Sequence, residues 1–275
     1  MTSIMKKTSI AIVYATKGGM GDVGKFVVKH ALSQPTLYDT RIIALSDEAV
    51  EGTDIGYDVG VTDELLKSNM KQMLQSVEIT KLDIKHPDTT QHIAEIFDGV
   101  DCVIACVGNR QPSMSRWITN GLESILTAMN NKGIKKIVAL SSFGLGNDHT
   151  PLSIIKVVWG TMLSTILRDV YYDLVGMEEA VVASKLDYVL VRPVGLTPEM
   201  QITNTYHTLT GVNNNNTSNN TNNTTGSGGV DGDVEAHLEI SKSDVALFML
   251  KEATPHTSNF NNMKVTICGS EAKKI

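Results

Sequence analysis

Near the N-terminus the chain reads Ile10-Ala-Ile-Val-Tyr-Ala-Thr-Lys-Gly18-Gly-Met-Gly21-Asp-Val-Gly24-Lys25, an apolar run, a glycine-rich turn and then a helical pattern that begins near Val23. The apolar, β-branched run predicts a buried strand. A helix N-terminus offers backbone N–H groups and a partial positive charge to an anion. Glycines in the turn leave no Cβ between the backbone and that anion. The stretch therefore predicts a strand, turn and helix that hold a phosphate-bearing ligand.

The glycine spacing makes that ligand more specific. Gly19-Met-Gly21-Asp-Val-Gly24 has the spacing G-x-G-x-x-G, which binds the pyrophosphate of a dinucleotide when a strand precedes it and a helix follows. The alternative is a glycine-rich turn that binds nothing. The residues predicted to contact the pyrophosphate are Gly18, Gly19, Gly21, Asp22, Val23 and Gly24.

The same strand and helix pattern recurs along the chain. Seven short apolar runs are predicted as strands, and amphipathic stretches between them as helices, which is typical of repeated βα units. We expect one α/β domain over residues 1–275, a doubly wound parallel sheet of the Rossmann type. The expected strands are Ser9–Tyr14, Thr40–Leu45, Val77–Leu82, Cys102–Val107, Lys136–Leu140, Tyr188–Val191 and Lys264–Cys268. The expected helices are Val23–Leu32, Leu65–Leu74, His92–Phe97, Ile118–Met129, Ile154–Ala183 and Asp244–Ala253.

Local signals mark some helix ends. Asp88 and Asp244 stand where N-caps are expected, and Gly133 suits the left-handed turn that closes a helix. The long helix over Ile154–Ala183 predicts a bend near Gly160 or Gly176.

One tract departs from the globular pattern. Residues 211–229 are almost entirely Asn, Thr, Ser and Gly, a composition with too little apolar surface to offset the entropy of ordering. We expect a disordered surface insertion within the domain, because a helix and a strand of the same sheet are predicted after it.

Further candidate residues follow the ends of the predicted strands, at the carboxyl edge where open α/β sheets bind ligands. A carboxylate after the second strand, such as Asp47, accepts hydrogen bonds from a ribose and favours NAD. The alternative for Asp47 is a solvated acid in a loop, and the alternative for Ser141 and Ser142 is that they only cap the loop. The candidates for cofactor binding at this edge are Ser46, Asp47, Asp83, Ile84, Gly108, Asn109, Arg110, Ser141 and Pro193, with Ser142 as a catalytic candidate.

Composition limits the partners. With a formal net charge of -6 and a pI near 5.6, the chain has no general attraction for nucleic acid or for a membrane surface. Its three cysteines predict buried free thiols, and its seven scattered histidines show no metal-ligand spacing. No apolar run is long enough for a signal peptide or a membrane span, so we expect a cytoplasmic protein.

Four runs carry a family resemblance: Gly133-Ile-Lys-Lys-Ile-Val-Ala-Leu-Ser141-Ser142, Met177-Glu-Glu-Ala180, Ser184-Lys-Leu-Asp-Tyr-Val-Leu-Val-Arg192-Pro193 and Ile240-Ser-Lys-Ser-Asp-Val-Ala246. They resemble the atypical short-chain dehydrogenase/reductases, the group of NmrA-like proteins and biliverdin reductase B-like flavin reductases. The resemblance implies NAD(P)H-dependent reduction of a flat acceptor such as a flavin or quinone. It also implies that Ser142 orients a ring and that Tyr171 or Tyr172 lines the pocket, so these three residues are the catalytic candidates.

The chain departs from that group at several points. The Tyr-x-x-x-Lys pair of ordinary short-chain dehydrogenases is missing, because Val175 and Gly176 stand four residues after the two tyrosines. The histidine expected after the sixth strand is replaced near Gly195, and the first turn carries Tyr14-Ala-Thr-Lys17 before its glycines.

These departures leave two alternatives. One is a redox sensor or assembly factor that binds the dinucleotide without catalysis, and the other is a flavodoxin-like protein that binds FMN after the first strand. The cofactor is written NAD(P), with Lys17 and Arg110 favouring NADP slightly. The acceptor and the oligomeric state remain open.

Overall fold

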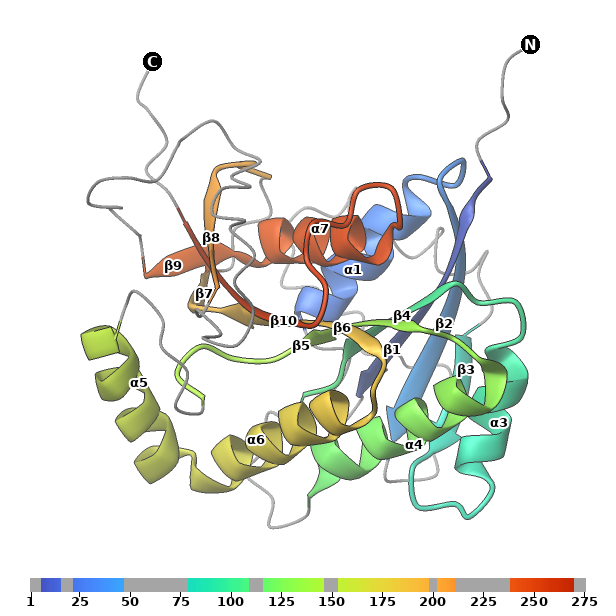
Figure 1. Cartoon of the computed structure of the whole chain (residues 1–275), viewed down its shortest axis with the longest axis horizontal. Coiled ribbons are helices and arrows are strands. Elements are labelled where there is room, and N and C mark those ends of the chain that lie inside the picture. The colour runs from blue at the N-terminus through green and yellow to red at the C-terminus, as the bar shows by residue number, and fades with distance from the viewer. Residues whose placement is uncertain are drawn as a thin grey trace, which may run out of the picture.

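The computed structural model describes residues 6–15, 22–46, 79–108, 116–145, 153–197, 202–210 and 238–269. These form a layered α/β fold around one large sheet (Figure 1). The sheet has eight strands in the order β3-β2-β1-β4-β5-β6-β10-β8. Its strands are β1 (Thr8–Ala15), β2 (Tyr38–Ser46), β3 (Ile79–Asp83), β4 (Cys102–Cys106), β5 (Lys136–Leu140), β6 (Asp187–Pro193), β8 (Tyr206–Thr210) and β10 (Met263–Gly269).

All neighbouring strands of this sheet run parallel except β8, which pairs antiparallel with β10 at the edge. The run from β3 to β6 has the 3-2-1-4-5-6 order of Rossmann folds. In flavodoxin-like folds the first strand lies beside the third, whereas here β1 lies between β2 and β4. The topology therefore excludes the flavodoxin-like alternative.

Helices cover both faces of the sheet, which is why its strands read as continuous apolar runs. Figure 1 shows α1 (Asp22–Leu32) and α7 (Lys242–Ala253) above the sheet, where they pack against each other. Below it lie α3 (Thr89–Ile96), α4 (Trp117–Lys132) and α6 (Arg168–Ala183), with α5 (Ser153–Ile166) beside α6. Alternate residues of β1 enter the two cores, with Ile10, Ile12 and Tyr14 in the upper one and Ala11 and Val13 in the lower one.

All seven predicted strands are present, and where the structure describes their ends the bounds agree to within two residues. Val77 and the helix expected at Leu65–Leu74 lie outside the described residues. The expected count of seven strands is too low, because the edge strand β8 and a small parallel pair, β7 (Gly195–Thr197) with β9 (Glu239–Ser241), were not predicted. These strands are short or largely polar, so they lack the apolar run on which the prediction rested.

Two helix-end predictions are wrong. The long helix is divided at Leu167, between α5 and α6, and neither Gly160 nor Gly176 bends it. Helix α7 is capped by Ser241, whose Oγ accepts from the Asp244 backbone N at 3.0 Å, so Asp244 lies in the first turn. Gly133 does close α4 with a φ of 70°, as predicted. Asp88 occupies the N-cap position of α3, although its side chain makes no capping hydrogen bond.

Gly160 has a packing role instead. Gly144 turns with a φ of +90° after β5, and a Cβ added at Gly160 would lie 2.7 Å from the Gly144 carbonyl oxygen. The backbone of α5 therefore lies directly against the turn that follows β5, a contact that only glycine permits.

The three cysteines are buried and free, as predicted. Burial raises the pKa of Cys102 and Cys106 to about 12 and that of Cys268 to about 11. They remain neutral thiols at neutral pH and are therefore poor nucleophiles.

Candidate functional site

The sheet has a topological switch point between β1 and β4. From β1 the chain continues to β2 and β3 on one side, and from β4 it continues to β5 and β6 on the other. Dinucleotides bind outside the carboxyl ends of the strands at such a point. Here β1 ends at Ala15 and α1 begins at Asp22, with Val23 buried in the core, so that the helix N-terminus lies at this edge. Gly24 belongs to the first turn of α1. The intervening glycines Gly18, Gly19 and Gly21 lie outside the described residues.

Carboxylates lie at two other helix N-termini. Asp173 of α6 accepts from the backbone N of Ile118 at 2.8 Å and of Thr119 at 2.9 Å, and so caps α4. Asp244 accepts from Ser241 Oγ at 2.8 Å in the first turn of α7. Asp173 thus satisfies two backbone donors of α4, and both carboxylates interact favourably with a helix dipole. At the switch point itself, the helix N-terminus that follows β1 is that of α1.

The candidates at the ends of β2 and β3, Ser46 and Asp83, lie side by side, because they are partners in the strand register. The Asp83 carboxylate accepts from the Lys85 backbone N at 2.8 Å and shapes the turn after β3. Ile84 packs partly buried against the lower core, where its Cδ1 would lie 2.8 Å from a Cβ added at Gly121. Asp47, one residue beyond β2, lies outside the described residues.

Gly108 follows β4 at the same edge. It is exposed, and a Cβ added there would meet no atom of the described residues within 4 Å. Among the residues that the structure describes, none makes a steric demand for glycine at this position. Asn109 and Arg110 lie outside the described residues.

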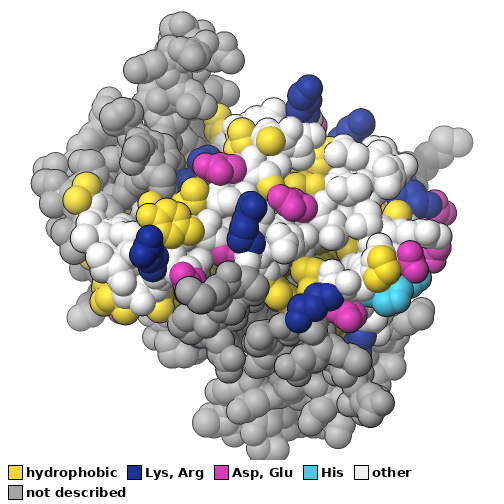
Figure 2. Space-filling model, turned by 90° about the horizontal axis from the view of Figure 1, so that it is seen from below, with side chains coloured by type: hydrophobic (Ala, Val, Ile, Leu, Met, Phe, Trp, Pro, Cys, Tyr) yellow, Lys and Arg dark blue, Asp and Glu magenta, His cyan; other side chains and the backbone are white. Residues whose placement is uncertain are grey.

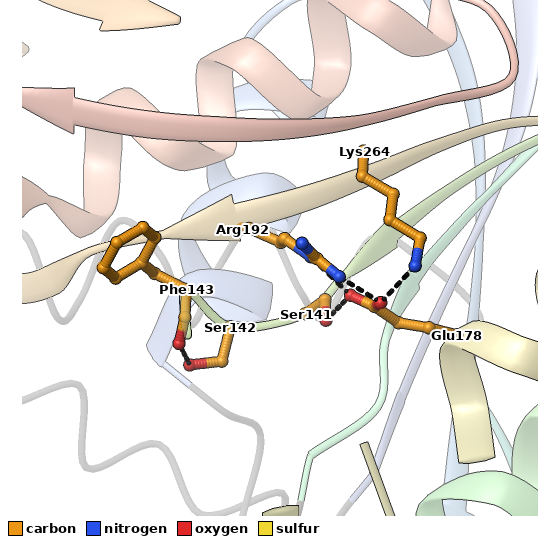
Figure 3. A network of polar contacts seen from close by, with 6 residues as sticks. All are labelled: Ser141, Ser142, Phe143, Glu178, Arg192 and Lys264. Carbon is orange, nitrogen blue, oxygen red and sulfur yellow. Dashed lines mark hydrogen bonds and ion pairs between the residues drawn. The ribbon is translucent and has the colours of Figure 1, made fainter. Parts of the chain in front are cut away.

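A buried ionic network holds together the ends of β5 and β6 (Figure 3). The Glu178 carboxylate of α6 accepts from Arg192 Nε at 2.8 Å and from its Nη2 at 2.5 Å, a two-point contact. Lys264 Nζ of β10 lies 3.1 Å from the same carboxylate, and Ser141 Oγ donates to it at 2.6 Å. Arg192 is 1% exposed and Glu178 is 3% exposed. Burial would raise the pKa of Glu178, but hydrogen bonds and charge from Arg192 and Lys264 outweigh it and lower that pKa.

The network separates the two candidate serines. Ser141 is buried and its hydroxyl is directed to Glu178. Ser142 is half-buried, and Figure 3 shows its side chain directed away from Glu178, with its Oγ donating to the Phe143 carbonyl at 3.2 Å. Pro193 is buried at the end of β6 and its carbonyl accepts from the Phe143 backbone N at 3.1 Å. Ser142 is therefore the better placed serine for contact with a ligand.

The two tyrosines lie in the first turns of α6. Tyr171 is half-buried, and Tyr172 is 58% exposed, with the Arg168 guanidinium 5.8 Å above its ring. A Cβ at Gly176 would lie 2.9 Å from Thr119 Oγ1 of α4, so this position has no room for a lysine side chain. The structure thus explains why the Tyr-x-x-x-Lys pair is missing at Tyr172.

Glu178, Arg192 and Lys264 were not predicted as site residues. Glu178 and Arg192 were noted only within runs that carry the family resemblance. The available signal was an arginine at the end of the apolar run Val189–Val191, because a buried charge requires a partner. That the partner is Glu178 could not be read from the sequence, since tertiary packing brings the two together.

The outer surface of the lower helices is mixed in charge. Figure 2 shows acidic, basic and apolar side chains interspersed over the face that carries α3, α4 and α6. Within the described parts of the chain, no three His, Cys, Asp or Glu side chains are grouped as metal ligands. No helix among them has the length and apolarity needed to cross a membrane.

Comparisons with known proteins extend this picture. A family model described as NAD(P)H-binding matches residues 18–255. No match was found among curated proteins. A short-chain dehydrogenase/reductase from Veillonella parvula DSM 2008, solved in complex with NADP, is similar with a TM-score of 0.59 and 13% identity, over 98% of this chain and 96% of that one.

Two further solved structures are similar over 96% of this chain and 100% of their own. A protein proposed to be an NADH-flavin reductase, from Streptococcus pneumoniae TIGR4, has a TM-score of 0.58 and 14% identity. ChuY, an anaerobilin reductase from Escherichia coli O157:H7, has a TM-score of 0.57 and 15% identity. At such low identity these likenesses show the fold. The family match spans most of the chain, from the glycine turn through β4 to α7, so the protein belongs to the NAD(P)H-binding family of Rossmann-fold proteins.

Proposed function

We propose that the protein is an NAD(P)H-dependent oxidoreductase that reduces a flat acceptor such as a flavin or a quinone. The observation that carries this proposal is the N-terminus of α1 at the switch point of a chain in the NAD(P)H-binding family. The reduced nicotinamide supplies a hydride with its electron pair, and a proton from solvent completes the reduction of the acceptor. Such chemistry needs little more from the protein than binding and orientation.

The residues of the chain have distinct proposed roles. Residues 18–24 bind the pyrophosphate, and Ser46, Asp83 and Gly108 border the adenosine and nicotinamide halves at the carboxyl edge. Ser142 orients the reacting ring through its hydroxyl, while Tyr171 and Tyr172 line the acceptor side. Acid catalysis by a tyrosine is not required, because flavins and quinones accept a proton from water.

The test is a turnover assay with NADH and NADPH against FMN, riboflavin, a soluble quinone and a linear tetrapyrrole. The last acceptor is included because ChuY is named an anaerobilin reductase. We expect oxidation of the reduced nicotinamide with at least one acceptor, and a marked loss of that rate in Ser142→Ala. Absence of turnover with every acceptor would contradict the proposal.

Cofactor preference is a separate question. The solved complex of the Veillonella protein contains NADP. Lys17 and Arg110 would favour the extra phosphate of NADP, whereas Asp47 would favour NAD. We infer a slight preference for NADP. Calorimetry with both dinucleotides measures it, and tighter binding of NAD would overturn it.

A second candidate function is a non-catalytic redox sensor that binds the dinucleotide and a partner protein. The close packing of Gly176 against Thr119, which excludes a lysine after Tyr172, favours it. It predicts tight dinucleotide binding without turnover, and a partner that binds in only one redox state of the cofactor.

A further inference from the structure

The Glu178 network binds Ser141, the residue that directly precedes Ser142 in the chain. Ser142 is the residue proposed to contact the reacting ring. The segment Ser141–Leu145 follows β5 and contains one half-exposed residue, Ser142, among four buried ones. Two backbone hydrogen bonds extend the β5–β6 pairing past the end of β5: Ser141 N to the Val191 carbonyl at 2.7 Å and Phe143 N to the Pro193 carbonyl at 3.1 Å. Ser142 is thus held from both sides by its neighbours.

Stability alone does not explain why the charged residues Glu178, Arg192 and Lys264 are grouped here. A buried ion pair loses most of its electrostatic gain to desolvation, and apolar side chains of similar size are often as stable. An apolar pair would not direct the Ser141 hydroxyl, however. Glu178 does so with a 2.6 Å hydrogen bond, while Arg192 and Lys264 hold the carboxylate from β6 and β10 (Figure 3).

We propose that Glu178 is a positioning residue: by binding Ser141 it fixes the turn after β5 and aims the Ser142 hydroxyl at the acceptor side. The inference rests on the proposed reductase function for its kinetic consequence. Its structural consequence, an ordered turn at residues 141–145, does not depend on turnover. Glu178 acts through Ser141 and the backbone, and touches neither cofactor nor acceptor.

The chain offers a matched control. Glu252 of α7 is 0% exposed and accepts from Ser258 Oγ at 3.0 Å, Asn259 N at 3.0 Å and Phe260 N at 3.1 Å. It thus holds a loop with its carboxylate as Glu178 does. That loop also contacts Lys136, the first residue of β5, at the opposite end of the strand from Ser141. Glu252→Gln therefore removes a buried carboxylate without disturbing the turn after β5.

The kinetic experiment compares Glu178→Gln, Ser141→Ala and Glu252→Gln in the full chain. We expect Glu178→Gln to lower kcat about tenfold or more, as small misplacements of reacting groups do, with the dinucleotide Kd changed less than about twofold. Ser141→Ala should act in the same direction, and Glu252→Gln should keep kcat. In a double-mutant cycle, Glu178→Gln should add nothing once Ser142 is alanine. Additive losses, or an equal loss in Glu252→Gln, would overturn the proposal.

Amide hydrogen exchange gives a readout that needs no turnover. Loss of Glu178 or of the Ser141 hydroxyl should speed exchange at the Phe143 amide about tenfold or more, while Glu252→Gln leaves that amide protected. If the wild type has no reductase activity, the proposed function fails and exchange alone decides the positioning role. Unchanged protection at Phe143 in Ser141→Ala, the milder variant and the one to use if Glu178→Gln does not fold, would overturn it.

Discussion

At the residue scale, Gly108 allows the needs of folding to be distinguished from the needs of ligand binding. A Cβ there meets no atom in the described part of the chain, so Gly108→Ala should leave the unfolding free energy unchanged within about 0.5 kcal/mol. If the dinucleotide lies against the protein backbone at Gly108, the added methyl group should weaken dinucleotide binding about tenfold. Calorimetric titration alongside thermal unfolding measures both effects. A variant that binds as tightly as the wild type would show that Gly108 does not border the cofactor.

His30 makes a second residue-scale prediction. It is buried between α1 and α7, where its Nε2 lies 2.9 Å from Ser243 Oγ. Burial, with a contribution from Lys29 and partly opposed by Asp244, lowers its pKa from 6.5 to about 4. Because the unfolded chain takes up the proton first as pH falls, the contribution of His30 to stability is constant above pH 6.5 and declines towards pH 4.

That decline amounts to about 3 kcal/mol at most, from the pKa difference. His30→Gln keeps a hydrogen-bonding side chain but cannot be protonated. Urea unfolding at several pH values should therefore show the wild type losing more stability than His30→Gln between pH 6.5 and 4. Parallel curves would contradict the assignment of the lowered pKa.

At the element scale, α4 depends on a carboxylate from another helix. Asp173 of α6 accepts hydrogen bonds from the backbone N of Ile118 and of Thr119. The N-cap residue of α4, Arg116, makes no side-chain capping hydrogen bond. Asp173→Ala should lower the unfolding free energy by about 2 to 3 kcal/mol, since it leaves buried donors without an acceptor. Denaturant unfolding measures the loss. Glu179→Ala, an exposed acid on the same helix, should change stability by less than about 0.5 kcal/mol.

The elements also show what could be predicted from the sequence. Strands β1 to β6 and β10 are apolar and flanked by helical patterns, so each could be found from its own residues. Strand β8, Tyr-His-Thr-Leu-Thr, shows only a weak alternation of apolar and polar residues. It is a strand because it pairs with β10 at the sheet edge, which its own sequence does not reveal. The division at Leu167 and the partner of Arg192 likewise depend on packing between segments distant in the chain. Local patterns therefore predicted the sheet and its carboxyl edge, but not the Glu178 network.

At the scale of the whole molecule, the Asn-rich tract over residues 211–229 lies outside the described residues, which end at Thr210 before it and resume at Leu238 after it. Before it, Thr210 ends β8 opposite Val265 of β10. After it, the Leu238 carbonyl accepts from the Gly195 backbone N at 2.9 Å, and β9 pairs with β7, the strand that directly follows Pro193. The tract thus joins two segments that are each fixed to the main body, one of them close to the end of β6.

Deletion of Val212 to Gly228 should therefore leave the fold intact. The cost of closing a loop grows only with the logarithm of its length, so we expect the unfolding free energy to change by no more than about 1 kcal/mol. Dinucleotide affinity should also be retained, because the switch point lies between β1 and β4, and β8 is at the far edge of the sheet. A selective change in the acceptor KM would assign the tract to a lid over the acceptor side. Loss of folding would instead show that the tract contributes ordered contacts to the domain.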